Sequence, residues 1–395
     1  MPFTGVSSME LKREFAELFW AEGVDRSELC RRYGISRTLG YRTARRFAEA
    51  GLAGLAERSR RPHVSPKATS AAIEAAVLEV RRQHPAWGGR KIAATLARQG
   101  QSAPAPSTIS AILRRNGVEL GAAGGGAAAF IRFEHAQPNE LWQMDFKGHV
   151  ALRSGRLHPL TVLDDHSRFA VVLAACANEQ TETVKDHLIE AFRRYGLPRR
   201  ITTDNGPPWG DGPGNPYTPL GVWLIEHGVA ISHSTPYHPQ TQGKAERFHR
   251  SLKAEVLGEA PFEDLEHAAR ALADWRSVYN AERPHEALGM AVPIERYTPS
   301  PRPYRESVEP FDYAPGDVVR RVCASTGRVS FQGQSFRQPK AFGGKRIALR
   351  PTRADGLYDV VFRHIRIGSI DLRSQQAQPQ PVTDVSEHLL PMSPV

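Results

Sequence analysis

The sequence contains few cysteines and no long hydrophobic run. Its three cysteines, Cys30, Cys176 and Cys323, are odd in number and far apart among 395 residues. They therefore indicate neither a disulfide framework nor a zinc site, and they favour a reducing compartment. No apolar run approaches the roughly 18 residues of a membrane span, and residues 1–5 lack the basic-then-apolar layout of a secretory signal. We expect a cytoplasmic protein with no membrane partner.

Positive charge is concentrated at one end of the chain. The formal net charge is +10, and the first 118 residues contain 20 Lys and Arg against 10 Asp and Glu, a difference of +10. The remainder is thus nearly neutral. A basic excess confined to one region is typical of a module that binds a polyanion such as DNA. A generally arginine-rich surface is the alternative.

Residues 1–56 have the pattern of a helix-turn-helix domain. Three short helices are expected within residues 10–49, with a tight turn at Gly34 and Asp25 or Ser27 as a helix cap. The third helix would enter the major groove of DNA with its N-terminal side chains nearest the bases. The predicted DNA-contacting residues here are Ser36, Arg37, Thr38, Tyr41, Arg42 and Arg45. A three-helix bundle with a basic surface is the alternative.

Residues 66–118 repeat this organisation after a basic, proline-containing linker. Helices are expected at about 69–83, 88–99 and 106–116, and Asn116-Gly117 is a good helix stop. The predicted DNA contacts of this second domain are Ser107, Thr108 and Arg114. Tandem modules can read a longer site and increase affinity through effective concentration.

The remaining chain separates into an α/β region and an all-β region. Residues 119–136 include a Gly/Ala-rich flexible linker, and residues 137–297 alternate strands and helices in a way that suggests a mixed sheet flanked by helices. A Pro-rich linker at 298–316 leads to six short strands in 317–373, which we interpret as a small β-barrel. Residues 374–395 are predicted to be a disordered tail.

Three acidic residues of the α/β region occupy informative positions. Asp145 lies on the polar face of a predicted strand, Asp204 ends another, and Glu246 lies in the first turns of a helix. That helix is expected to present one polar stripe: Glu246, His249, Arg250 and Lys253. Carboxylates suit Mg²⁺ and Mn²⁺, and three of them can hold two such ions for phosphoryl displacement. Scattered surface acids are the alternative.

Several motifs together resemble the integrase-core transposases of bacterial insertion sequences, which are relatives of retroviral integrases with an RNase H-like fold. The motifs are Trp142-Gln-Met-Asp145, Thr203-Asp-Asn-Gly206, His238-Pro-Gln-Thr-Gln-Gly-Lys-Ala-Glu246 with Lys253, and Asp164-Asp-His-Ser-Arg168. The resemblance covers roughly residues 130–300. It implies a multidomain protein with tandem all-α helix-turn-helix units, an α/β RNase H-like catalytic core and a small all-β C-terminal domain.

The resemblance also implies roles for individual residues. Asp145, Asp204 and Glu246 would be the catalytic acids and the ligands of two Mg²⁺ or Mn²⁺ ions, and Asn205 and Gly206 would shape the turn that presents Asp204. Four residues would lie near the DNA or contact it: His238, Gln240, Gln242 and Lys253. A hydrogen bond that stabilises its loop is the alternative role for His238. Weaker acidic candidates are Asp164, Asp165, Asp211 and Glu255.

One departure from the family pattern is the long interval between Asp204 and Glu246. The Pro/Gly-rich residues 207–219 account for it, and we expect them to form a surface insertion. The implied activity is that of a bacterial, nucleoid-associated transposase. It would bind terminal inverted repeats, cut and join DNA in the presence of metal ions, and act as a homo-multimer on duplex DNA. A catalytically silent DNA-binding regulator and a nuclease without joining activity are the alternatives.

Overall fold

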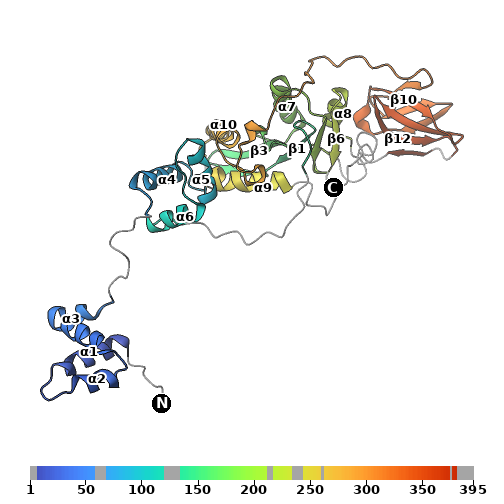
Figure 1. Cartoon of the computed structure of the whole chain (residues 1–395). Coiled ribbons are helices and arrows are strands. Elements are labelled where there is room, and N and C mark those ends of the chain that lie inside the picture. The colour runs from blue at the N-terminus through green and yellow to red at the C-terminus, as the bar shows by residue number, and fades with distance from the viewer. Residues whose placement is uncertain are drawn as a thin grey trace. The chain divides into compact units, whose positions relative to one another are not determined.

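The computed structural model describes residues 7–57, 68–119, 134–210, 217–233, 243–258, 262–373 and 376–379. The chain divides into two compact units, Met1–Ala68 and Thr69–Val395. Figure 1 labels their helices and strands. Among the described residues, no helix combines the length and the apolar character needed to cross a membrane.

The first unit is a three-helix domain. Its helices are α1 (Ser8–Phe19), α2 (Arg26–Arg32) and α3 (Arg37–Leu55). Asp25 is the cap of α2, because its carboxylate accepts hydrogen bonds from the first N–H groups of that helix. Gly34 lies between α2 and α3 with φ of +63°, a conformation that suits glycine. The predicted helix order and turn are confirmed, and α3 continues beyond the predicted end across a break at Gly51.

The second unit begins with another three-helix domain. Its helices are α4 (Ala71–Gln83), α5 (Gly89–Arg98) and α6 (Pro106–Arg115). They enclose a hydrophobic cluster around Trp87, Ile92 and Ile109. Gly89 allows α5 to approach α6 closely, because a Cβ there would lie 2.4 Å from the Pro106 carbonyl oxygen. The three predicted helices are therefore present.

A mixed sheet forms the centre of the α/β region. Its strands are β1 (Leu141–Phe146), β2 (Val150–Leu152), β3 (Gly155–Asp164), β4 (Ala170–Cys176), β5 (Arg200–Thr203) and β6 (Ala230–His233). The order is β2-β3-β1-β5-β6, and β4 lies off this path and also pairs with β3. Strands β1, β5 and β6 are parallel, and β3 is antiparallel to its neighbours. The mixed sheet expected from the sequence is confirmed.

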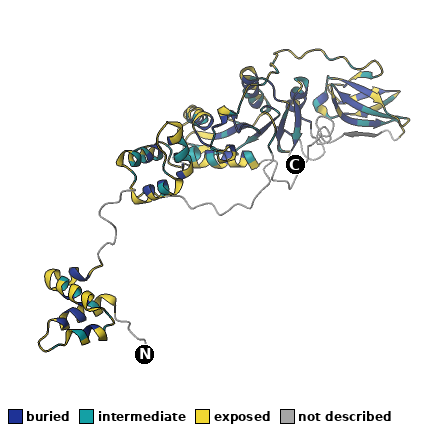
Figure 2. Cartoon of the chain, in the orientation of Figure 1, coloured by how far each residue is buried: buried dark blue, intermediate teal, exposed yellow. Residues whose placement is uncertain are grey.

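Helices cover this sheet on both faces (Figure 1). They are α7 (Thr181–Tyr195), α8 (Pro219–Glu226), α9 (Gly243–Leu252), the π-helical turn η2 (Lys253–Leu257) and α10 (Leu265–Ala281). Helices α7 and α8 share a hydrophobic cluster with Trp142 and Met144 of β1. Helices α9 and α10 share another with Leu163 and Leu173. Figure 2 shows the buried strands between these layers, and the short 3₁₀ turns η3 (Glu286–Leu288) and η4 (Pro293–Glu295) follow α10.

The all-β region consists of open sheets, so the predicted barrel is wrong. Five strands follow the order β13-β12-β11-β10-β7, and β8 pairs with β9 alone. Their bounds are β7 (Val318–Arg321), β8 (Arg328–Phe331), β9 (Gln334–Arg337), β10 (Arg346–Pro351), β11 (Leu357–Phe362), β12 (Ile365–Asp371) and β13 (Gln376–Pro379), with the 3₁₀ turn η5 (Lys340–Phe342) before β10. The β8–β9 hairpin packs its apolar side chains on the larger sheet, where the Phe331 and Tyr358 rings lie 4.8 Å apart. The larger sheet thus buries its apolar face by stacking on the hairpin, and not by closing its two edge strands into a barrel.

Two other predictions need correction. Gln376–Pro379 was expected to belong to a disordered tail, but it forms β13 and pairs with β12. The loop after Asp204 is not wholly a surface insertion, because Trp209 and Tyr217 are each 1% exposed and lie in the core cluster. Residues 211–216 lie outside the described residues. Tyr217 also contacts Phe342, with ring centroids 5.0 Å apart, and so links the core to the all-β region.

Candidate active site

Two of the three predicted acids come together at one end of the sheet. Parallel pairing of β1 with β5 sets Gln143 against Thr202, and extending this register by two residues brings Asp145 alongside Asp204. Asp204 follows β5 directly, and its Oδ1 accepts a hydrogen bond from the Gly206 N–H at 3.2 Å. The His233 ring donates its Nδ1–H to the Asp204 carbonyl oxygen at 2.7 Å. The turn after β5 is therefore held to the neighbouring strand β6.

Burial and mutual repulsion perturb these two carboxylates. Burial, and after it the negative charge of Asp204, raises the pKa of Asp145 to about 7. Burial also raises the pKa of Asp204, although the Gly206 N–H opposes the rise. Desolvated carboxylates held near each other disfavour their charged forms. A divalent cation would relieve both costs, so this pair fits the hard, oxygen-preferring ions Mg²⁺ and Mn²⁺.

Glu246 lies on the helix that packs beside Asp145. Helix α9 packs Phe248 and Leu252 against the sheet, buries Ala245 as well, and leaves Glu246 exposed. Within the described residues, no three Asp, Glu, His or Cys side chains are close enough together to hold a metal ion. The structure thus unites Asp145 and Asp204, and the role of Glu246 as third ligand stays a prediction.

His249 differs from its predicted place on a solvated polar stripe. It is 8% exposed, its Nε2 lies 2.9 Å from the Thr161 hydroxyl, and its Nδ1 lies 3.8 Å from Asp145 Oδ2. Because Thr161 donates its proton to the Asp145 carbonyl oxygen at 2.8 Å, His249 Nε2 is the donor to Thr161. Burial lowers the pKa of His249 to about 4, so the ring is neutral at neutral pH. One helical turn after Glu246, this histidine fixes α9 to Thr161 of β3, which in turn donates to the Asp145 backbone in β1.

Glu179 is a site residue that the sequence analysis missed. It is exposed in the connection between β4 and α7, and its charge raises the pKa of both Asp145 and Asp204. The His158 ring lies 2.8 Å from its carboxylate. No motif or periodicity marks Glu179, since an acid before a helix is common. Its electrostatic effect on the two aspartates arises from the fold.

The weaker acidic candidates have structural partners. Asp164 is fully buried, and its carboxylate accepts hydrogen bonds from the Asn139 N–H and from Ser167. Asp165 is 1% exposed and forms an ion pair with Lys244. Glu255 accepts hydrogen bonds from Trp275 Nε1 at 2.9 Å and Arg283 Nε at 3.0 Å. Asp211 lies outside the described residues.

The predicted DNA contacts of the core are partly outside the described residues. His238, Gln240 and Gln242 all fall there. Lys253 is exposed at the start of η2, beyond the last turn of α9. These four assignments stay predictions.

The helix-turn-helix domains expose their predicted DNA-binding residues. On α3 and its cap all six are exposed: Ser36, Arg37, Thr38, Tyr41, Arg42 and Arg45. On α6, Ser107 and Arg114 are exposed, and Thr108 is half-buried. Ser36 also caps α3 by accepting the Leu39 N–H. Exposure leaves these side chains accessible to a ligand, and their contacts with DNA stay predictions.

Family profiles match every part of this organisation. Integrase core domain profiles match residues 135–239 and 227–293, and the C-terminal domain profile of the IS481 family of transposases matches 317–378. A helix-turn-helix profile matches 12–63 and a homeodomain-like profile matches 40–113.

Similar proteins come from bacterial insertion elements and from retroviruses. An uncharacterized 31.7 kDa protein of insertion element IS407 of Burkholderia multivorans is 27% identical over 62% of this chain and 87% of its own length. A 39.2 kDa protein of IS476 of Xanthomonas euvesicatoria is 31% identical over 40% of this chain and 44% of its own. The Gag-Pro-Pol polyprotein of mouse mammary tumor virus is 36% identical over 30% of this chain and 6% of its own.

Two solved structures with some likeness to this chain are viral. The HTLV-2 integrase catalytic core domain in complex with magnesium has a TM-score of 0.33 and 17% identity, and covers 41% of this chain and 99% of its own. The simian T-cell lymphotropic virus intasome in complex with a PP2A regulatory subunit has a TM-score of 0.38 and 14% identity, over 72% of this chain and 91% of its own.

Proposed function

We propose that this chain cuts and joins DNA. It has the domains of a bacterial insertion-sequence transposase with an integrase-like core. Its substrates would be the terminal inverted repeats of its own element and a target duplex. The reaction would be a polynucleotidyl transfer that requires divalent metal ions. A transposase with helix-turn-helix DNA-binding domains and an integrase core is supported by the matched profiles.

The observation that carries the proposal is the pair Asp145 and Asp204. Two carboxylates from parallel strands lie at one sheet end, and burial raises the pKa of each. Such an arrangement is costly unless a cation binds there. Asp145, Asp204 and Glu246 would hold two Mg²⁺ or Mn²⁺ ions. When bound, such ions activate a water or 3′-hydroxyl nucleophile and stabilise the leaving oxygen at the phosphorus.

The protein's own groups would order this site. His249 and Thr161 hold the Asp145 backbone through a buried hydrogen-bond chain. Gly206 and His233 hold the turn that carries Asp204. The exposed basic residues of α3 and α6 would bind the terminal repeats. Joining requires two element ends at one target, so we propose that the protein acts as a homo-multimer on DNA.

The test is strand transfer by the purified full chain. Labelled duplex from the element's ends is mixed with plasmid target and Mg²⁺ or Mn²⁺, and joined products are counted. Asp145→Asn, Asp204→Asn and Glu246→Gln should each lower the rate about 100-fold or more, because a metal ion supplies several kcal/mol and each 1.4 kcal/mol is tenfold. End binding should stay within about twofold.

The matched controls are Asp186→Asn and Glu190→Gln, which neutralise exposed acids on α7. Both should retain wild-type joining. Joining by Asp204→Asn at the wild-type rate would overturn the metal-site assignment. End binding with no cut or joined product by the wild type would favour a silent regulator, and cutting without joining would favour a nuclease.

A further inference from the structure

The first turn of α9 is anchored by a partly buried ion pair. Lys244 is the second residue of this helix, and its Nζ lies 2.5 Å from Asp165 Oδ1 and 3.2 Å from the Asp165 carbonyl oxygen. The side chains of Lys244 and Asp165 are 17% and 1% exposed. Glu246 follows Lys244 by two residues in the same turn. Whatever fixes Lys244 therefore also limits where Glu246 can lie.

Asp165 is itself fixed to the strand that carries Asp145. Its Oδ1 also accepts a hydrogen bond from Gln143 Nε2 at 2.9 Å, and its backbone N–H donates to the Leu141 carbonyl oxygen at 2.9 Å. Gln143 precedes Asp145 by two residues on the same face of β1. A continuous polar connection therefore runs from the strand of Asp145, through Gln143 and Asp165, to the helix of Glu246.

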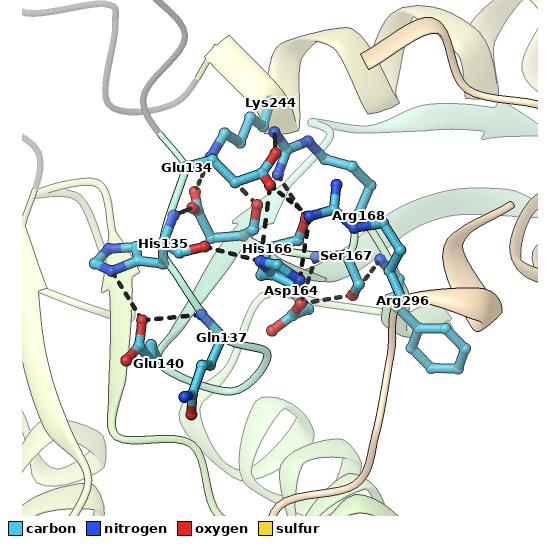
Figure 3. A network of polar contacts seen from close by, with 12 residues as sticks. Glu134, His135, Gln137, Glu140, Asp164, His166, Ser167, Arg168, Lys244 and Arg296 are labelled. Carbon is cyan, nitrogen blue, oxygen red and sulfur yellow. Dashed lines mark hydrogen bonds and ion pairs between the residues drawn. The ribbon is translucent and has the colours of Figure 1, made fainter. Parts of the chain in front are cut away.

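Further charged groups surround this connection (Figure 3). Glu134 pairs with Arg168 at 3.0 Å and with Arg296 at 2.8 Å. The neighbouring His135 donates its backbone N–H to Asp165 Oδ2 at 3.0 Å, and its carbonyl oxygen lies 2.8 Å from the His166 ring nitrogen. Both oxygens of the Asp165 carboxylate are thus engaged, and its direction is set independently of Lys244.

Energetics favour a positional role for this ion pair. Asp165 is buried and Lys244 is half-buried, so desolvation of the two charges offsets much of their attraction and the pair adds little stability, whereas removing Lys244 leaves a costly unpaired buried charge. Its clearest effect is to select one arrangement of the elements that it joins. Here those elements are β1 with the end of β3 and the first turn of α9.

We propose that Asp165 and Lys244 are positioning residues that hold Glu246 toward Asp145 and Asp204. This inference rests on the proposed function, since it takes Glu246 as the third metal ligand. Neither residue contacts the reacting atoms. Loss of the pair would release the first turn of α9, so Glu246 would be presented less often and more metal would be needed for the same rate.

The experiment compares Lys244→Met with a matched control, Lys345→Met. Lys345 also pairs with a carboxylate, that of Glu226 at 2.7 Å, but it joins the all-β region to α8. Strand transfer by the full chain is measured across Mn²⁺ concentrations. Loss of an outer residue that orients a ligand typically costs about 10- to 100-fold. We expect the half-saturating Mn²⁺ concentration to rise by that factor for Lys244→Met and to stay unchanged for Lys345→Met.

A second readout does not depend on activity. Amide hydrogen exchange of residues 243–252, without metal or DNA, should accelerate about tenfold or more in Lys244→Met and stay unchanged in Lys345→Met. If Lys244→Met fails to fold, the double variant Asp165→Asn/Lys244→Met removes both charges and leaves none unpaired. It should fold and still require more Mn²⁺.

The outcomes separate the two proposals. An unchanged Mn²⁺ requirement and unchanged exchange in Lys244→Met would overturn the positioning role. Weaker, less salt-dependent end binding with an unchanged Mn²⁺ requirement would identify Lys244 as a phosphate contact and overturn it too. A wild type that never joins DNA contradicts the proposed function, and hydrogen exchange then still decides whether Lys244 orders α9.

Discussion

At the candidate site, the fold shifts the pKa values of single residues away from their ordinary values. The pKa of Asp145 rises to about 7 through burial and the nearby Asp204 charge, while His249 is kept neutral by burial at the same sheet end. Perturbed groups of opposite type in one place are typical of functional sites. The matched integrase core profile covers this place.

His285, away from these acids, should make stability depend on pH. Burial lowers its pKa to about 3, with help from the positive charges of Arg283, Lys91 and Arg168, and its Nε2 is covered and has no partner among the described residues. The unfolded chain, with a histidine pKa near 6.5, therefore binds more protons between pH 6.5 and 3. The stability that the neutral His285 contributes is fully present above pH 6.5. It is lost as the pH falls toward 3, with a slope approaching about 1.4 kcal/mol per pH unit.

Urea unfolding at pH 7.0 and pH 5.0 measures this effect. His285→Gln should lose less stability than wild type over that range. The exposed His149→Gln should match wild type. Equal losses in wild type and His285→Gln would show that another group controls the acid slope.

Elements were predictable where their signals are local. Asp25 and Pro106 mark helix starts in the sequence, and each lies at one in the structure. The alternation around Asp145 predicted the burial of Trp142 and Met144, but it missed Gln143, which is 5% exposed on the face expected to be polar. Closure of the all-β region was predicted wrongly, because strand periodicity says nothing about which edges pair. The burial of His249 was missed for a related reason: what packs on a helix face depends on distant sequence.

Close packing of α3 gives a prediction at the element scale. A Cβ at Gly40 would lie 2.5 Å from Cys30 Sγ and 3.1 Å from the Phe15 ring. Gly40→Ala should therefore force α3 away from α1 and α2 and destabilise this domain by about 1–3 kcal/mol. Hydrogen exchange of residues 8–55 in the full chain reports this loss.

The control is Glu49→Ala, at an exposed position of the same helix. It should change stability by no more than about 0.5 kcal/mol. Unchanged protection in Gly40→Ala would mean that the three helices can separate without cost, contrary to their packing.

At the scale of the whole molecule, basic charge should govern DNA affinity. The exposed Arg37, Arg42 and Arg45 of α3 would each neutralise a phosphate, and each contact contributes about 0.9 to the slope of log affinity against log salt. The triple alanine variant should lower that slope by about 2–3 units. Fluorescence anisotropy with terminal-repeat duplex between 50 and 200 mM salt measures this slope.

The control is Arg13→Ala on α1, which should change the slope by less than one unit. An unchanged slope in the triple variant would place DNA on another surface.

The link between the core and the all-β region restricts how these parts can be exchanged with other proteins. Tyr217, from the segment after Asp204, packs on Phe342, and Glu226 pairs with Lys345. The two regions thus share a hydrophobic cluster, although a Pro-rich stretch separates them in sequence. A chimera cut at that stretch would expose the Phe342 ring. A graft of the C-terminal region onto another core should carry Tyr217 and Glu226, or equivalents, with it.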